Sequence, residues 1–113
     1  MTPRGFVTSS VVAALVVGVL GGIRPAGAAD VNVTQRDRTF SEKSVTVKAG
    51  DRVVFTNADG IVHNVYSVTP GHEFELKTQK PGQSDTVPFT KPGTIEVQCA
   101  IHPKMKLQVT VAP

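Results

Sequence analysis

Residues 94–111 read TIEVQCAIHPKMKLQVTV, and two alternating runs flank a short loop in this stretch. Apolar residues alternate with polar ones up to Cys99, and they alternate again from Met105 onward. A period of two is typical of strands that bury one face. We therefore predict two strands joined by a loop, with the Cys99 and Met105 side chains both on the inward face.

The loop carries three side chains that bind soft or borderline metal ions. Cys99 is the only cysteine, Met105 is the only methionine besides Met1, and His102, one of three histidines, lies between them. A thiolate, an imidazole and a weakly bound thioether suit copper better than any hard cation. A blue-copper site needs two histidines, so a second must come from elsewhere, and His63 is our candidate.

Two other uses of these residues are weaker. Zinc would accept one thiolate and two imidazoles, but a thioether is a poor fourth ligand and the loop offers no carboxylate. Cys99 and His102 could form a nucleophile–base pair, but Ile101 and Pro103 provide no group that would orient the imidazole. We therefore predict a metal-binding protein that is not an enzyme and has no catalytic residues.

Residues 1–28 are interpreted as a secretory signal peptide, which leaves one domain over 29–113. A short basic start containing Arg4 precedes an apolar run, and small residues then offer a cleavage site after Ala28 or Ala29. The alternative is an uncleaved membrane anchor, although the run is close to the lower length limit of about 17 residues. Cleavage predicts a periplasmic or secreted protein whose mature domain does not insert into the membrane.

The charge balance gives no sign of a nucleic-acid partner. The whole sequence has a net charge of +3, and without Arg4 and Arg24 there remain ten basic and nine acidic residues. The basic residues are scattered and form no patch interleaved with aromatic residues. The single cysteine excludes a disulfide within the chain, and an unpaired cysteine in an exported protein calls for a role.

The rest of the domain reads as short strands separated by turns, and no segment shows a helical period over eleven or more residues. We predict strands around residues 31–33, 45–47, 52–56, 62–68 and 84–90, and a short helix or strand around 74–76. The 45–47 and 52–56 segments look like a β-hairpin, residues 36–42 look like a loop, and Pro88 indicates an edge strand. The fold class is therefore all-β, an antiparallel-rich Greek-key sandwich or barrel of about seven strands.

These features together resemble the cupredoxins, the small blue-copper proteins. The resemblance rests on the residues VTVKAGD at 45–51, Asn57, His63-Asn64, Pro92-Gly93 and the Cys-x-x-His-x-x-Met spacing of the last loop. That short loop is similar to the loop of amicyanin, on a framework similar to plastocyanin. The resemblance implies a cupredoxin-like Greek-key β-sandwich and one type 1 copper, held by His63, Cys99, His102 and Met105.

The resemblance also implies roles for residues around the metal. Asn64 would tie the His63 segment to the ligand loop. The family usually has Ser or Thr directly after the cysteine as partner for that Asn, whereas this chain has Ala100, so the bond would be lost or rerouted to the backbone. His102 would be the ligand nearest the surface, within an apolar docking patch made of Ile101, Pro103 and Ile61.

The function implied by the resemblance is the transfer of single electrons between exported redox proteins such as a cytochrome or a dehydrogenase, by a monomer. The alternative is a copper-carrying or copper-buffering protein of the cell envelope, because the same ligands would serve it. Electron transfer predicts fast exchange with a redox partner, whereas carriage predicts delivery of copper to an acceptor apoprotein.

Overall fold

A computed structural model describes residues 29–113, so the predicted signal peptide over 1–28 lies outside the described residues. The described part consists of strands, turns and loops, and within it no helix is long and apolar enough to cross a membrane. The strands are β1 (Asp30–Arg36), β2 (Thr39–Phe40), β3 (Ser44–Lys48), β4 (Asp51–Asn57), β5 (Val65–Ser67), β6 (Phe74–Glu75), β7 (Ser84–Phe89), β8 (Gly93–Cys99) and β9 (Lys106–Ala112).

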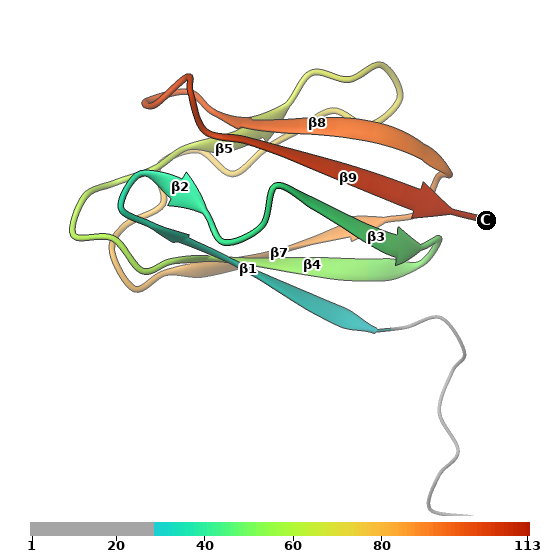
Figure 1. Ribbon diagram of the computed structural model, residues 1–113, viewed down its shortest axis with the longest axis horizontal. Helices are drawn as coiled ribbons and strands as arrows, with labels where there is room; N and C mark the ends of the chain where they lie inside the picture. Colours follow the sequence, from blue (N-terminus) through green and yellow to red (C-terminus); the bar gives the residue numbers. More distant parts are fainter. Residues whose placement is uncertain (1–28) are drawn as a thin grey trace, which may run out of the picture.

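Two sheets pack face to face as a β-sandwich (Figure 1). One sheet has the strand order β2-β1-β4-β7 and the other has the order β3-β9-β8-β5-β6. The β1–β4 and β3–β9 pairs are parallel, and the remaining pairs are antiparallel. The all-β sandwich is confirmed. The strands number nine rather than about seven because β2 and β6 have only two residues each, too few to show a period.

The β-hairpin predicted for the segments that form β3 and β4 is wrong. The two strands lie in different sheets, since β3 pairs with β9 while β4 pairs with β1 and β7. In the turn between them, Ala49 donates its N–H to the carbonyl oxygen of Ala112, and Gly50 donates to that of Phe89. The turn therefore crosses from one sheet to the other, because its hydrogen bonds go to strands of both sheets.

Three segments with weaker sequence patterns, at residues 36–42, 74–76 and 84–90, all contain strands. The predicted loop over 36–42 contains β2, which pairs with β1 and buries Phe40. The short element expected around 74–76 is the strand β6. The strand that contains Pro88 is β7, and it lies at a sheet edge as predicted, because a proline has no N–H for a second neighbour.

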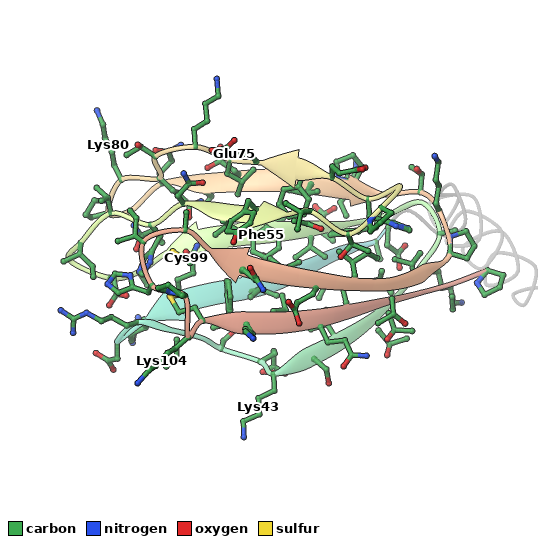
Figure 2. The ribbon with its side chains drawn as sticks, turned by 90° about the horizontal axis from the view of Figure 1, so that it is seen from above. Lys43, Phe55, Glu75, Lys80, Cys99 and Lys104 are labelled. Carbon is green, nitrogen blue, oxygen red and sulfur yellow. The ribbon has the colours of Figure 1, made fainter. Side chains whose placement is uncertain are left out.

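Phe55, labelled in Figure 2, lies in the core between the two sheets. It is fully buried, and its ring packs against those of Phe40 and Phe74 at centroid distances of 6.4 and 6.2 Å. Full burial of one such side chain contributes roughly 1.5–3 kcal/mol to folding.

The β8–β9 pair positions the predicted ligand loop. Val97 pairs with Leu107 and Gln98 with Lys106, and Cys99 ends β8, so residues 100–105 form the loop between the two strands. Figure 1 shows this loop at the end of the sandwich opposite the C-terminus. The predicted alternation is confirmed, since inward residues of both strands are buried on either side of the loop.

The Asp51 carboxylate fastens the turn before β4 to the first described residue. It accepts the N–H of Lys48 at 2.9 Å and that of Ala29 at 3.0 Å. These two backbone hydrogen bonds, in that order, lower the pKa of Asp51 below its ordinary value of 3.8, although burial opposes them. Because the folded-state pKa is the lower one, the carboxylate stabilises the fold at neutral pH. That contribution is lost as the pH falls through the folded-state pKa.

We expect Asp51→Asn to lower the free energy of unfolding at neutral pH, because the amide presents an NH₂ group to one of the two backbone donors. The loss should shrink in acid, where the wild-type carboxylate is itself protonated. Urea denaturation at both pH values checks this. Asp30→Asn is the matched control, since Asp30 and Arg52 form an exposed ion pair, and such pairs contribute only about 0–1 kcal/mol. An equal loss at both pH values would contradict the prediction.

Candidate metal centre

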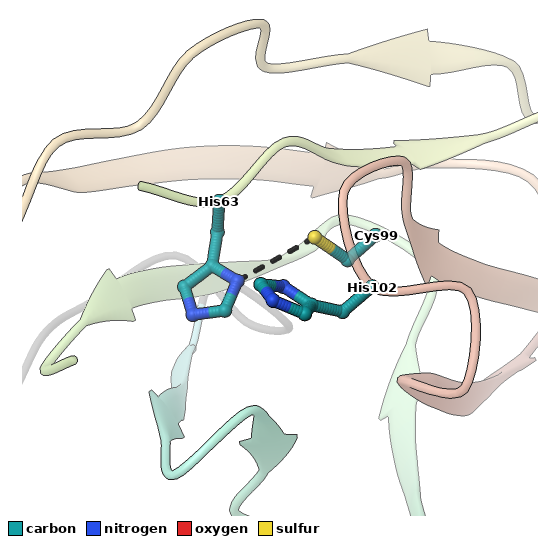
Figure 3. A group of neighbouring side chains, drawn as sticks. All are labelled: His63, Cys99 and His102. Carbon is teal, nitrogen blue, oxygen red and sulfur yellow. Dashed lines mark hydrogen bonds between the residues drawn. The ribbon is translucent and has the colours of Figure 1, made fainter. Parts of the chain in front are cut away.

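Three donor side chains converge at the loop end of the sandwich. Cys99 ends β8, His102 lies in the loop that follows, and His63 comes from the segment before β5 (Figure 3). One ligand atom of each lies within 4.8 Å of the others. Nδ1 of His63 is 3.5 Å from Sγ of Cys99, and the two imidazole centroids are 5.2 Å apart. The fold thus brings His63 to the loop across 36 positions of sequence.

The three donors differ in their access to solvent. His63 and Cys99 are fully buried, whereas His102 is half-buried. Buried polar atoms almost always have a hydrogen-bond partner, yet Nδ1 of His102 is sealed from solvent and has none. An unpartnered imidazole nitrogen beside a thiol and a second imidazole is what a metal-ligand set requires.

Met105 is the fourth predicted donor. It is 2% exposed and directly precedes β9. Its N–H donates to the carbonyl oxygen of His102 at 2.9 Å, which closes the loop into a tight turn. The thioether therefore returns to the inner face of the sheet, and its burial suits an axial ligand as well as core packing.

Asn64 joins the His63 segment to the ligand loop through its backbone. Its N–H points at Sγ of Cys99 at 3.4 Å, and its carbonyl oxygen accepts the N–H of Ala100 at 2.9 Å. The Asn64 side chain donates instead to Glu75, at 3.3 Å, and its buried Oδ1 has no partner. The tie is therefore made by the backbone, consistent with the absence of a hydroxyl at Ala100.

Asp59 is a site residue that the sequence analysis missed. Its Oδ2 lies 2.7 Å from Nε2 of His63. A carboxylate only accepts hydrogen bonds, so this contact places the ring proton on Nε2 and leaves the Nδ1 lone pair free on the Cys99 side. Burial raises the pKa of Asp59, but the hydrogen bonds from His63, Arg38 and Asp37 outweigh it and lower the pKa overall. The only signal in the sequence was a carboxylate four residues before the histidine.

Gln79 is a second support of His63 that the sequence did not reveal. The two residues exchange backbone hydrogen bonds of 3.0 and 2.7 Å in an isolated bridge. The Gln79 side chain is fully buried, accepts from Gln35 at 2.6 Å and donates to the carbonyl oxygen of Phe55 at 2.9 Å. Because Gln35 and Phe55 lie on β1 and β4, this amide links the His63 segment to the opposite sheet.

Comparison with known sequences and structures identifies the family. The sequence model of copper-binding proteins of the plastocyanin/azurin family matches residues 28–112. The chain belongs to this family. It is thus a cupredoxin, as the resemblance implied, and its sandwich is the cupredoxin fold.

Two curated relatives come from Methylorubrum extorquens. Amicyanin-alpha is 34% identical over 105 residues, which cover 90% of this chain and 88% of that protein. The methylamine utilization protein MauL is 30% identical over 89 residues, which cover 78% of each chain.

Solved structures agree with this placement. A mutant of amicyanin in its Cu(I) form is 29% identical with a TM-score of 0.65, and the match covers 80% of this cupredoxin and 87% of that chain. The copper-containing nitrite reductase of Thermus scotoductus is 25% identical with a TM-score of 0.71. That match covers 81% of this chain but only 24% of the reductase, so the likeness is confined to a part of it.

The residues at the site fit the copper of this family. One thiol and two imidazoles converge, and a thioether is buried at the end of the same loop. This set of soft and borderline donors favours copper, whereas a thioether is a poor ligand for zinc. A metal ion would also provide the partner that Nδ1 of His102 lacks.

Apolar residues flank the half-buried His102 in the chain, and others lie in the segment that leads to His63. Ile101 is 45% exposed, Pro103 is exposed, and Ile61 is half-buried. Val62, which precedes His63, is 39% exposed and was not among the predicted patch residues.

Proposed function

We propose that this cupredoxin holds one type 1 copper through His63, Cys99 and His102, with Met105 as a weak axial ligand, and that it carries single electrons between redox proteins. We further propose that it acts as a carrier and not as an enzyme. The observation that carries the proposal is the pairing of two fully buried donors with one half-buried donor whose Nδ1 has no other partner. Copper supplies a reversible one-electron couple when it is bound.

The chain holds these donors in place through contacts that need no metal. The Asn64 N–H points at the sulfur of Cys99, and a backbone bridge to Gln79 fixes the His63 segment. The ring of His63 is oriented by Asp59. Donors that are held in advance move little when their charge changes, and a small rearrangement suits rapid exchange of an electron.

His102 is proposed as the route by which electrons enter and leave. Of the three converging donors it alone is not fully buried, and Ile101 and Pro103 flank it in the chain. We propose that these two residues and Ile61 form an apolar docking patch around it. A small apolar patch is easily desolvated, which suits a partner that docks briefly and then leaves.

The test of the function is Ile101→Lys. We expect electron self-exchange between oxidised and reduced protein to slow at least about tenfold, because like charges would meet across the docked patches. The visible spectrum should stay nearly unchanged, since Ile101 is not a proposed ligand. NMR line broadening in mixtures of the two oxidation states measures the rate.

Val68→Lys is the matched control, because Val68 is 72% exposed at the other end of β5. It adds the same charge away from the site and should change self-exchange little. An equal effect of both substitutions would place the port elsewhere. Transfer of copper to an acceptor apoprotein, without fast self-exchange, would favour the alternative role in copper carriage or buffering.

The proposals for export and for redox partners rest on the N-terminal sequence and on the similarity to the two curated relatives. The signal peptide over 1–28 would be cleaved after Ala28 or Ala29, and cleavage after Ala28 keeps the Ala29 nitrogen that donates to Asp51. We expect the mass of the native protein to correspond to a chain that starts at Ala29 or Asp30, and an intact N-terminus in a membrane fraction would contradict this. We propose a periplasmic or secreted monomer that exchanges electrons with a redox protein such as a cytochrome or a dehydrogenase. The similarity to amicyanin-alpha and to MauL, a methylamine utilization protein, supports a redox partner in methylamine utilization.

A further inference from the structure

The turn between β1 and β2 has a backbone conformation that one of its residues does not favour. Asp37 and Arg38 have φ angles of 53° and 58°, in the left-handed region. Two consecutive residues of this kind are typical of a hairpin turn in which Asn-Gly, Asp-Gly or Gly-Gly is common. Asp37 suits the first position, but Arg38 stands where glycine is usual, so steric repulsion at its Cβ opposes the conformation, and a further contact must hold it.

The support comes from Asp59. Its Oδ1 accepts the N–H of Asp37 at 2.6 Å, and its Oδ2 accepts the N–H of Arg38 at 3.0 Å. The same Oδ2 faces Nε2 of His63 at 2.7 Å. One carboxylate with a side-chain exposure of 10% therefore binds the strained turn and the imidazole at once.

We propose that the β1–β2 turn is a positioning element of the metal centre. Its two amides fix the direction of the Asp59 carboxylate, and the carboxylate fixes the tautomer and orientation of the His63 ring. Asp37 and Arg38 are exposed, whereas the His63 ring on which they act is fully buried.

The geometry favours coupling through Asp59 over a purely local role for the turn. The Asp59 backbone is itself anchored, because its N–H donates to Oδ1 of the buried Asn57 at 2.9 Å. With the backbone fixed, the carboxylate can only rotate about its side-chain bonds, and the turn amides set that rotation. Displacement of either amide leaves the carboxylate free to turn away from Nε2.

The first test uses the metal-free protein, so it needs no assumption about copper. Long-range ¹H–¹⁵N NMR of the His63 ring should show one tautomer, with the proton on Nε2. Arg38→Pro removes one turn amide and cannot adopt a positive φ, so we expect the ring signals to shift toward a mixture of tautomers. Arg38→Gly keeps the amide and tolerates the turn, so it is the matched control and should leave the ring signals in place.

A reciprocal measurement serves if Arg38→Pro fails to fold. Coupling between two sites acts in both directions, so His63→Phe, which lacks a ring N–H, should loosen the turn. We expect the amides of Asp37 and Arg38 to exchange their hydrogens several-fold faster, with the amide of Val53 in the central strand β4 as reference. Unchanged exchange rates would overturn the proposal.

Loading with Cu(II) extends the test to function. Asp59→Ala and Arg38→Pro should move the reduction potential in the same direction, and the double variant should match Asp59→Ala alone, because both act through one carboxylate. Additive shifts of the reduction potential in the double variant would overturn the inference. His63 ring signals that are unchanged in Arg38→Pro would also overturn it.

The inference depends on the proposed function only in that His63 is taken to be a ligand. If the His63 ring responds to the turn variants as expected but the chain binds no copper, the proposed function is refuted and the coupling between the turn and the ring still holds. If the chain forms a blue copper site but the His63 ring signals do not change in Arg38→Pro, only this inference is refuted.

Discussion

Cys99→Ala is expected to abolish the blue colour of the Cu(II)-loaded protein completely. The intense visible band of a type 1 site is a thiolate-to-copper transition, and Cys99 is the only thiol in the chain. Copper affinity should fall by more than the roughly 10–100-fold that follows the loss of a residue that only supports a ligand. Visible absorption and a competition titration with a Cu(I) chelator measure the two effects.

The substitution should leave the fold in place. Cys99 is fully buried and unpaired, and alanine is smaller and apolar, so the far-ultraviolet circular dichroism should match that of the wild type. Met105→Leu is the matched variant in the same loop, because it removes a sulfur while keeping an apolar side chain, and it should retain a thiolate band. A Cys99→Ala protein that stays blue, or a wild type that is colourless with Cu(II), would refute the proposed site.

Phe55→Ala should be the most destabilising substitution of a single core residue. Phe55 is fully buried between the rings of Phe40 and Phe74, so truncation leaves a cavity, and such changes cost about 3–5 kcal/mol. Domains of this size are stable by only about 5–15 kcal/mol. Chemical denaturation of the metal-free protein should therefore show a large loss of unfolding free energy.

Metal binding should offset part of that loss. A ligand present at a thousand times its dissociation constant adds about 4 kcal/mol to the stability of the state that binds it. We therefore expect the melting temperature of Phe55→Ala to rise on addition of Cu(II). Val68→Ala, at a residue that is 72% exposed, is the control and should change stability by less than about 0.5 kcal/mol. A similar loss in both variants would contradict the assigned core.

Local features of the sequence were enough to predict the ligand loop. The alternating runs on either side of it indicate two strands, and the loop between them is so short that its donors must lie near one another. The rarity of the donors then indicated a metal, because the single cysteine and the only internal methionine both fall in this loop. His63 was predicted because a blue-copper site needs a second histidine and because the chain resembles the cupredoxins.

Tertiary packing decided the rest. The strands β3 and β4 both alternate apolar and polar residues and look like a hairpin in sequence, but they lie in different sheets. Alternation shows that a strand buries one face, but it does not show which strand is its hydrogen-bonded neighbour. The pattern likewise could not reveal that Asp59 meets His63 and the β1–β2 turn, or that Gln79 bridges to His63.

The physical reason is the range of the interactions. Alternation and loop length act between neighbours in the chain and are visible in sequence. The roles of Asp59 and Gln79 depend also on contacts between distant segments, since Asp59 meets Asp37 across 22 positions and Gln79 meets Gln35 across 44. The chain sequence by itself therefore determined the donors of the loop, and only the folded structure decided what holds the remote histidine against them.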